Sequence, residues 1–245
     1  NPSDITLNNL TIDENAAKGL LVGAFTTTDL DVGDTHIYSL IDKVGMDNDK
    51  FVIVGNELKT SFSFDYEIKD TYVINVMTDD NKGGTFTKQF IITINDQNDA
   101  PHLIEITSDE VQEEQIIGTV VGVFSTEDVD VNDTHTYSLV AGKGSDDNAK
   151  FTLSKDTLKT ALVFDISAQS QYTIRLQTTD VKGQTFEQSF VIKIKDINDA
   201  PKEITLSNNL VSENMPINTV IGSFTTTDDD VNDTHKYSLG TGTGR

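Results

Sequence analysis

The sequence predicts an all-β protein built of tandem antiparallel β-sandwiches of immunoglobulin-like size. Apolar residues alternate with period two, a pattern of about 100 residues returns along the chain, and no long window carries a helical stripe. Seven short strands fit into one copy of the pattern, as in a seven-stranded Greek-key sandwich of about 100 residues. A unit of that length can bury a core of its own.

The alternation is clearest in two segments of each copy. One segment carries Tyr72, Ile74 and Val76, matched by Tyr172, Ile174 and Leu176; the segment after it carries Phe86, Phe90, Ile92 and Ile94, matched by Phe186, Phe190, Ile192 and Ile194. Glycines at turn positions separate the segments. In the first copy the strands are predicted at residues 4–12, 20–28, 35–41, 50–54, 56–60, 71–79 and 85–95.

The period is set by a tetrapeptide that occurs twice. Asn98-Asp99-Ala100-Pro101 returns as Asn198-Asp199-Ala200-Pro201. The period predicts three repeats, at residues 1–101, 102–201 and 202–245, the last being the truncated N-terminal part of a third copy. Because the chain begins and ends within the pattern, we expect it to be an excerpt of a longer array.

The charge balance excludes several classes of function. With 40 acidic and 18 basic residues the formal net charge is −22, which is the wrong sign for nucleic acid or an anionic membrane surface. Many carboxylates recur at fixed repeat positions, which favours binding of a multivalent cation over a solubilising surface. The chain has no cysteine, which excludes disulfides and thiolate zinc sites. No apolar stretch is long enough for direct membrane insertion of this segment.

Four acidic motifs recur in register. They are an Asp-x-Asn-Asp-x-Pro linker, an Asp-x-Asp pair after the second strand, an Asp-x-Glu motif in mid-repeat, and a Glu near the first strand. Together these motifs resemble the cadherin repeat, specifically the cadherin-like tandem repeats of large bacterial surface and secreted proteins, and the similarity covers the whole chain. The resemblance implies cadherin-type sandwiches at the cell surface or outside the cell.

The resemblance further implies that calcium ions bind at the junction between consecutive repeats. At the first junction the implied ligands are Glu14, Asp65, Glu67, Asp96, Asn98, Asp99, Asp128, Asp130 and Asp180. At the second junction they are Glu113, Asp165, Asp196, Asn198, Asp199, Asp228 and Asp230. Carboxylate and amide oxygens are the donors that Ca²⁺ prefers.

The second junction departs from the pattern. Ser167 stands where the Asp-x-Glu motif requires an acid, and Glu114 stands where the other repeats have Asn15 and Asn214. We therefore expect weaker or incomplete cation binding there. The matching acids at the N-terminal pole are predicted to be Asp29, Asp31 and Asp79. No upstream repeat contributes ligands there, so we do not expect this pole to hold calcium fully in this excerpt.

Other kinds of site fit the sequence less well. An EF-hand starting at Asp128 would place Asp133 where glycine is needed and Leu139 where the bidentate acid belongs. A glycosidase needs one carboxylate pair, whereas here the pairs recur in every repeat. The repeated His36, His135 and His235 are predicted to be strand-edge residues that bond a nearby Asp or the backbone.

The sequence thus predicts a non-enzymatic, calcium-binding and calcium-rigidified extracellular array that serves as the spacer or adhesion stalk of a large bacterial surface protein. Its partners would be calcium ions and another cell-surface protein. The alternative is a module that binds polysaccharide or a cell surface through its own face. The chain has no Trp and six Tyr, and most of the Tyr residues fall at core-like positions, which weakens the carbohydrate alternative.

Overall fold

The computed structural model describes residues 1–230 and 232–241, and the chain divides into two compact units. Unit 1 comprises residues 1–99 and 129–131, and unit 2 comprises residues 100–128 together with the chain from residue 132 onward. The final part of the third predicted repeat, residues 242–245, lies outside the described residues. The two units are described separately below.

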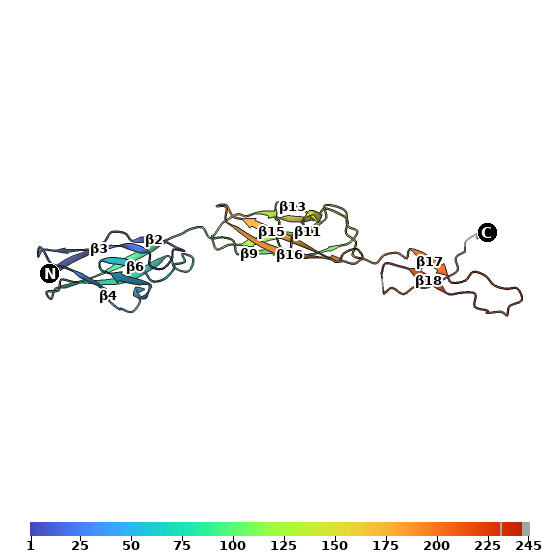
Figure 1. The fold of residues 1–245 in the computed structure, drawn as a ribbon, viewed down its shortest axis with the longest axis horizontal. Helices are drawn as coiled ribbons and strands as arrows, with labels where there is room; N and C mark the ends of the chain where they lie inside the picture. The colour runs from blue at the N-terminus through green and yellow to red at the C-terminus, as the bar shows by residue number, and fades with distance from the viewer. Residues whose placement is uncertain (231, 242–245) are drawn as a thin grey trace. The chain divides into compact units, whose positions relative to one another are not determined.

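Unit 1 is a sandwich of two four-stranded sheets (Figure 1). The first sheet has the order β1 (Pro2–Leu7), β3 (Leu21–Asp29), β6 (Glu57–Thr60) and β5 (Phe51–Val54), and the short 3₁₀ helix η1 (Asn48–Lys50) precedes β5. The second sheet has the order β2 (Thr11–Asp13), β8 (Thr85–Asn95), β7 (Thr71–Asp79) and β4 (Ile37–Leu40). The strands pair antiparallel except β2 and β8, which run parallel. The predicted all-β sandwich class is confirmed.

The first predicted strand, residues 4–12, is divided between the two sheets. β1 pairs with β3, whereas β2 pairs with β8 in the opposite sheet. Asn9 fixes the crossing because its side-chain amide donates to the carbonyls of Thr11 and Val22, both at 2.8 Å. One continuous alternating stretch therefore serves both sheets, a division that periodicity alone does not reveal.

Unit 2 repeats this topology. Its first sheet has the order β13 (Phe151–Ser154), β14 (Thr157–Thr160), β11 (Val120–Glu127) and β9 (Leu103–Ile106). Its second sheet has the order β10 (Glu110–Gln112), β16 (Thr185–Lys195), β15 (Gln171–Thr179) and β12 (Thr136–Leu139), and η2 (Asn148–Lys150) precedes β13. A separate two-stranded sheet follows, formed by β17 (Glu203–Leu206) and β18 (Phe224–Thr227).

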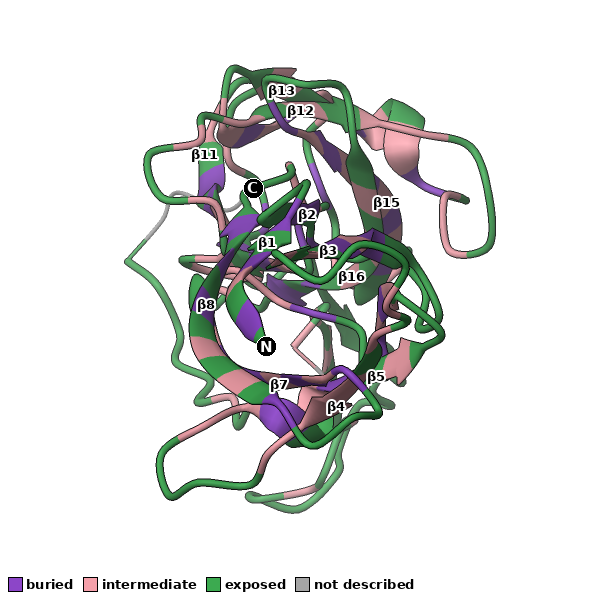
Figure 2. Cartoon of the chain, turned by 90° about the vertical axis from the view of Figure 1, so that its left-hand side faces the viewer, coloured by how far each residue is buried: buried purple, intermediate pink, exposed green. Residues whose placement is uncertain are grey.

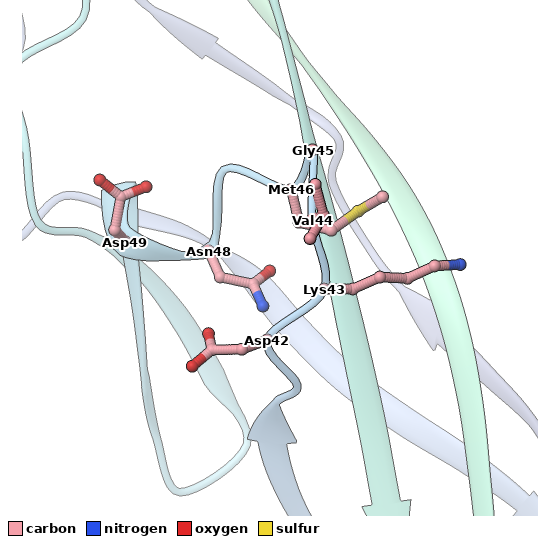
Figure 3. Close-up of a pocket in the computed structure, with 7 residues that line it drawn as sticks. All are labelled: Asp42, Lys43, Val44, Gly45, Met46, Asn48 and Asp49. Atoms are coloured by element: carbon pink, nitrogen blue, oxygen red, sulfur yellow. The ribbon is translucent and has the colours of Figure 1, made fainter.

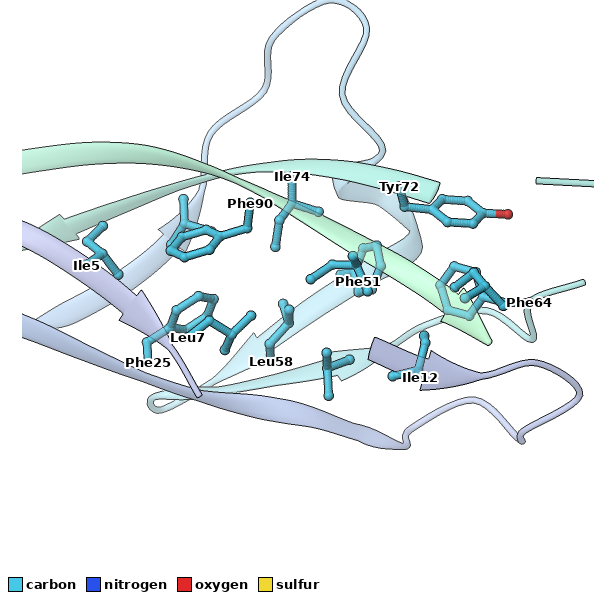
Figure 4. Packing of buried hydrophobic residues seen from close by; sticks show 14 residues of the cluster. Ile5, Leu7, Ile12, Phe25, Phe51, Leu58, Phe64, Tyr72, Ile74 and Phe90 are labelled. Carbon is cyan, nitrogen blue, oxygen red and sulfur yellow. The ribbon is translucent and has the colours of Figure 1, made fainter. Parts of the chain in front are cut away.

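The core of unit 1 lies between its sheets (Figure 4). Ile74 and Ile92, on neighbouring strands, are fully buried, and the inward residues of β8 alternate with exposed ones (Figure 2). Phe64 packs edge-on against Tyr72 with ring centroids 4.6 Å apart. Burial of each such side chain stabilises the fold by roughly 1.5–3 kcal/mol. The apolar residues predicted from the two alternating segments therefore pack between the two sheets and form part of the core.

A hydroxyl network links two sequences that recur in every repeat, the segment that begins at Phe25 (Phe124 in unit 2) and the Tyr-Ser-Leu tripeptide at Tyr38 (Tyr137 in unit 2). The Thr27 hydroxyl contacts the hydroxyls of Tyr38 and Thr78, both at 2.9 Å, and so links β3 to β4 and β7 across the sandwich. Thr126 makes the same pair of contacts in unit 2. A buried hydroxyl needs such a partner, so the Thr of one motif and the Tyr of the other are physically coupled.

The β17–β18 pair presents apolar side chains that the earlier repeats bury. Phe224 is 46% exposed, whereas its counterparts Phe124 and Phe25 are 3% and 1% exposed. In unit 2, strands β15 and β16 supply much of the opposite face of the core. The exposed face of β17 and β18 therefore corresponds to the face that β9 and β11 turn toward the core in unit 2.

Candidate metal centre

Five carboxylates gather at one end of unit 1. Glu14, Glu67 and Asp99 each offer an oxygen within 4.8 Å of the other two. Glu67 also forms such a group with Asp96 and Asp130. These five residues were all predicted as calcium ligands, and they come from four separate segments of the chain.

Parallel pairing of β2 and β8 places two of these acids. Because parallel strands end at the same edge of a sheet, Glu14 after β2 and Asp96 after β8 emerge at one pole. Glu14 is only 3% exposed, and its two oxygens accept the backbone N–H groups of Tyr66 at 2.6 Å and Gln97 at 2.8 Å. A buried carboxylate that bridges two loops in this way is held in a fixed orientation.

The linker is fixed by its own polar groups. The backbone N–H of Asp99 donates to Asp130 Oδ2 at 2.7 Å, and the Asn15 amide donates to Asp99 Oδ1 at 2.9 Å. Asn15 has a φ of 59°, in the left-handed region that Asn tolerates better than most residues. The Asn98 amide donates to the carbonyl of Asp99 at 2.8 Å, and Asp65 Oδ1 accepts the N–H of Ile68 at 2.9 Å.

The electrostatics of the cluster favour an added positive charge. Partial burial raises the pKa of the Glu67 carboxyl, and the negative charges of Glu14, Asp96 and Asp99 raise it further. Burial also raises the pKa of Asp99, against the hydrogen bond from Asn15, which lowers it. The ionised carboxylates repel one another, so a bound cation would stabilise the ionised forms.

Two further predicted ligands lie in unit 2. Asp128 shares a loop with Asp133, and each offers an oxygen within 4.8 Å of the other. Asp180 begins the β15–β16 turn, where its Oδ1 accepts the N–H groups of Lys182, Gly183 and Gln184 at 2.6–2.9 Å. The Asp180 carboxylate is therefore held by the backbone of its own unit.

Sequence reasoning missed one repeated acid. Asp133 Oδ2 is buried and is the sole buried side-chain oxygen or nitrogen without a hydrogen-bond partner among residues 1–230 and 232–241. Its counterpart Asp34 groups with Asp29 and Asp80 in unit 1. Both acids begin an Asp-Thr-His sequence that recurs in every repeat. The acid predicted at the pole of unit 1 is the neighbouring Asp79, whereas Asp80 is the one that groups with Asp29 and Asp34 and accepts the Gly84 N–H at 2.8 Å.

The three repeated histidines bond the first Asp of the Asp-x-Asp pair, as predicted. His36, His135 and His235 lie 3.1, 2.9 and 2.7 Å from Asp29, Asp128 and Asp228. The His235 contact lowers the pKa of Asp228, and that of Asp29 falls to about 2, chiefly through the N–H of Asp31. These pairs position the carboxylates that precede each loop.

The second predicted ligand set lies within unit 2 and is arranged differently. Glu113 is 4% exposed and bridges the N–H groups of Ile166 and Ile197, as Glu14 does in unit 1, and Asp199 N–H donates to Asp230 Oδ2 at 2.6 Å. Within the described part of the chain, however, no group of three carboxylates with oxygens inside 4.8 Å includes a member of the second predicted set: Glu113, Asp165, Asp196, Asp199, Asp228 and Asp230.

Two local differences accompany this looser arrangement. Asp165 Oδ1 accepts the side-chain hydroxyl and the N–H of Ser167, which lower the pKa of Asp165. The bond from the linker Asn is not one of the differences, because Asn198 donates to the carbonyl of Asp199 as Asn98 does to that of Asp99. Burial raises the pKa of Asp196, and so does its contact with Glu113.

A separate hollow of about 490 Å³ lies under the loop before η1 (Figure 3). Residues 42–46, 48 and 49 line it, among them the charged residues Asp42, Lys43 and Asp49. Asn48 anchors the loop by donating to the carbonyl of Ile41 at 2.8 Å. Because a single loop forms this hollow, we regard it as part of the loop's shape.

Comparison with known proteins agrees with this architecture. Protocadherin Fat 4 from Homo sapiens is 30% identical over 235 residues, covering 89% of this chain and 5% of that protein. Protein dachsous from Drosophila melanogaster is 29% identical over 231 residues, covering 86% of this chain and 6% of that protein. No family model matches the sequence.

Solved structures share the fold. The protocadherin GammaB4 extracellular domain aligns with a TM-score of 0.57 at 24% identity, covering 93% of this chain and 38% of that one. Human protocadherin-24 EC1-2 aligns with a TM-score of 0.60 at 20% identity, and the alignment covers 78% of this chain and 99% of that one. The chain is thus built of cadherin-like domains, and it spans 5% of the length of protocadherin Fat 4 and 6% of the length of protein dachsous. None of the helices in the described residues is long and apolar enough to cross a membrane.

Proposed function

We propose that this chain is a calcium-binding segment of an extracellular cadherin-like array that extends and stiffens a cell-surface adhesion protein. The observation that carries the proposal is the convergence of Glu14, Glu67, Asp96, Asp99 and Asp130 at one pole of unit 1. Similarity to protocadherins supports the same function, because those relatives are adhesion proteins and not enzymes. A bacterial parent stays a prediction, since both curated relatives described above are animal proteins.

The donor set fits calcium. Every group in the cluster is an oxygen, and Ca²⁺ takes six to eight oxygen ligands in flexible geometry. The linker residues Asp96, Asn98 and Asp99, with Glu14, Asp65, Glu67 and Asp130, would hold ions at unit 1, and Asp128 and Asp180 would offer ligand oxygens on unit 2. The buried, unpartnered Asp133 Oδ2 supports this assignment, since an unpaired buried carboxylate oxygen costs free energy unless it meets a cation. Bound calcium would neutralise the mutual repulsion of these groups.

Rigidity follows from the same chemistry. Two carboxylate charges 4.8 Å apart repel by about 0.9 kcal/mol even at the dielectric constant of water. In the absence of cations this repulsion favours conformations that separate the acids. With calcium the same acids become shared ligands, so that ion binding and stiffening are one event.

Small-angle scattering of the full chain tests the proposal. We expect a longer and narrower distance distribution in calcium than in chelator, and a smaller change with magnesium. The variant Asp130→Asn keeps an oxygen for the Asp99 N–H and removes one charge, so it should need more calcium for the same change. The matched variant Asp42→Asn, in the loop before η1, should behave like the wild type. Superimposable scattering in calcium and chelator would overturn the proposal.

The carbohydrate-binding alternative has less support. Tyr72 and Tyr172 are buried, and Tyr38 and Tyr137 are partly buried and pack against the two cores. Sugar binding would need exposed aromatic rings of the kind that these residues do not offer. Binding of any polysaccharide on a glycan array, with and without calcium, would favour this alternative.

A further inference from the structure

The second linker differs from the first in carrying a lysine. A cavity of about 200 Å³ in unit 2 is lined by the acids Glu113, Glu114, Asp165, Asp199 and Asp229 and by one basic residue, Lys202. Lys202 directly follows the second Asn-Asp-Ala-Pro tetrapeptide. The first linker is followed by His102 at this position, and Val129 stands where Asp229 does.

The lysine is anchored at both its backbone and its side chain. Its N–H donates to the carbonyl of Thr227 at 2.9 Å, which continues the β17–β18 pairing. Its ammonium forms an ion pair with Asp229 Oδ2 at the start of the loop after β18. The two anchors hold the ammonium at the rim of the acidic cavity.

The positive charge acts on more than its direct partner. The Asp229 contact raises the pKa of Lys202, and the charges of Asp199 and Asp165 raise it further. Burial and neighbouring acids raise the pKa of Asp199, and the Lys202 charge opposes that rise; the pKa of Asp165 is lowered chiefly by Ser167, and the Lys202 charge lowers it further. These two acids belong to the second predicted ligand set, so the ammonium is within electrostatic reach of both.

Unit 1 provides an internal precedent for an ammonium in such a place. Lys82 Nζ pairs with Asp34, whose side chain is 3% exposed and which groups with Asp29 and Asp80. The contact raises the pKa of Lys82. An ammonium group and a divalent cation therefore compete for the same kind of oxygen in this chain.

We propose that Lys202 is a built-in counter-ion of the second linker, which partly neutralises its carboxylates and thereby weakens calcium binding there relative to the first linker. The inference rests on the proposed calcium function and names the residue that makes the two linkers unequal. Ser167 removes one ligand charge, and Lys202 adds an opposing charge. Because of these two differences, the second linker needs a higher calcium concentration than the first to bind calcium.

Hydrogen exchange along a calcium titration of the full chain tests this proposal locally. Peptides covering residues 96–103 report the first linker, and peptides covering residues 196–203 report the second. In Lys202→Met, we expect the calcium midpoint for 196–203 to fall about three- to tenfold, because a nearby fixed positive charge repels a divalent ion even through a largely aqueous medium. The midpoint for 96–103 should not move. The difference should shrink as ionic strength rises.

Two matched variants complete the test. Lys202→Arg keeps the charge and should retain the wild-type midpoint, and Lys155→Met removes an exposed charge in the β13–β14 turn and should change neither midpoint. An unchanged midpoint for 196–203 in Lys202→Met, or an equal shift at both linkers, would overturn the role of Lys202 while leaving calcium binding intact. A wild-type chain in which neither linker responds to calcium would instead overturn the proposed function itself.

Discussion

Replacement of Glu67 by Gln is expected to have opposite effects with and without calcium. Glu67 belongs to both carboxylate groups of unit 1, so its charge lies within 4.8 Å of oxygens of Glu14, Asp96, Asp99 and Asp130. Gln has nearly the same shape and no charge. In chelator the change removes repulsion, and in calcium it removes a ligand.

The magnitude follows from the geometry. Each neighbour at 4.8 Å contributes about 0.9 kcal/mol at the dielectric constant of water. Glu67 is exposed, so solvent, salt and side-chain motion reduce the total, and we expect a net gain of about 1 kcal/mol in chelator at pH 7. In saturating calcium, a tenfold weaker affinity would remove about 1.4 kcal/mol of stabilisation.

The pH dependence has a defined sign. The folded pKa of Glu67 is raised above its ordinary value of 4.5, so the folded state holds this proton more tightly than the unfolded state does. The stability associated with this proton is complete below pH 4.5 and is lost as pH rises through the folded pKa. The advantage of Glu67→Gln in chelator should therefore disappear on acidification below that range.

Hydrogen exchange of the β7 and β8 amides measures the free energy of opening of unit 1 without interference from unit 2. Asp42→Asn, an equal change of charge in an exposed loop, serves as the control and should show neither effect. A Glu67→Gln variant that is less stable than the wild type in chelator, or equally stabilised by calcium, would refute the reasoning.

Three further changes have expected outcomes. Glu114 has a φ of 56°, in the left-handed region, so Glu114→Asn should raise the free energy of unfolding of unit 2 by about 0.5–1 kcal/mol in urea denaturation, and no gain would contradict the strain argument. Ile74→Ala, at a fully buried position, should cost about 2–5 kcal/mol and lower the melting temperature of unit 1 alone; a loss below 1 kcal/mol would mean that the core repacks. Thr126→Val removes the hydroxyl shared by Tyr137 and Thr178 at nearly constant volume and should cost about 1–2 kcal/mol by calorimetry, whereas an unchanged transition would show that the network adds nothing to stability.

Much of the fold could be predicted because its long strands have regular patterns. The predicted strands 71–79 and 85–95 coincide with β7 and β8, whose alternating residues face the core. Residues 4–12 were predicted as one strand because polar and apolar residues alternate in the same way through both β1 and β2. Its division depends on the bonds from Asn9, one of which reaches the distant residue Val22, and a local pattern does not contain that information.

The candidate site could be predicted from the sequence for a different reason. Glu14, Glu67, Asp96, Asp99 and Asp130 recur in register or match the family motif, and the fold brings all five together. Asp133 was overlooked because its buried, unpartnered oxygen is a tertiary property. The influence of Lys202 on Asp165 also depends on spatial proximity between segments far apart in the chain. Calcium ligation by any of these residues stays a prediction.

Calorimetric melting of the full chain in calcium, magnesium and chelator tests the central claim most directly. Binding of calcium to the folded linkers should raise the melting transitions by several degrees, since a ligand that binds only the folded state adds its binding free energy to stability. Magnesium, which is smaller and gives up its water reluctantly, should raise them less. Transitions that are identical in calcium, magnesium and chelator would contradict the account and leave only the fold.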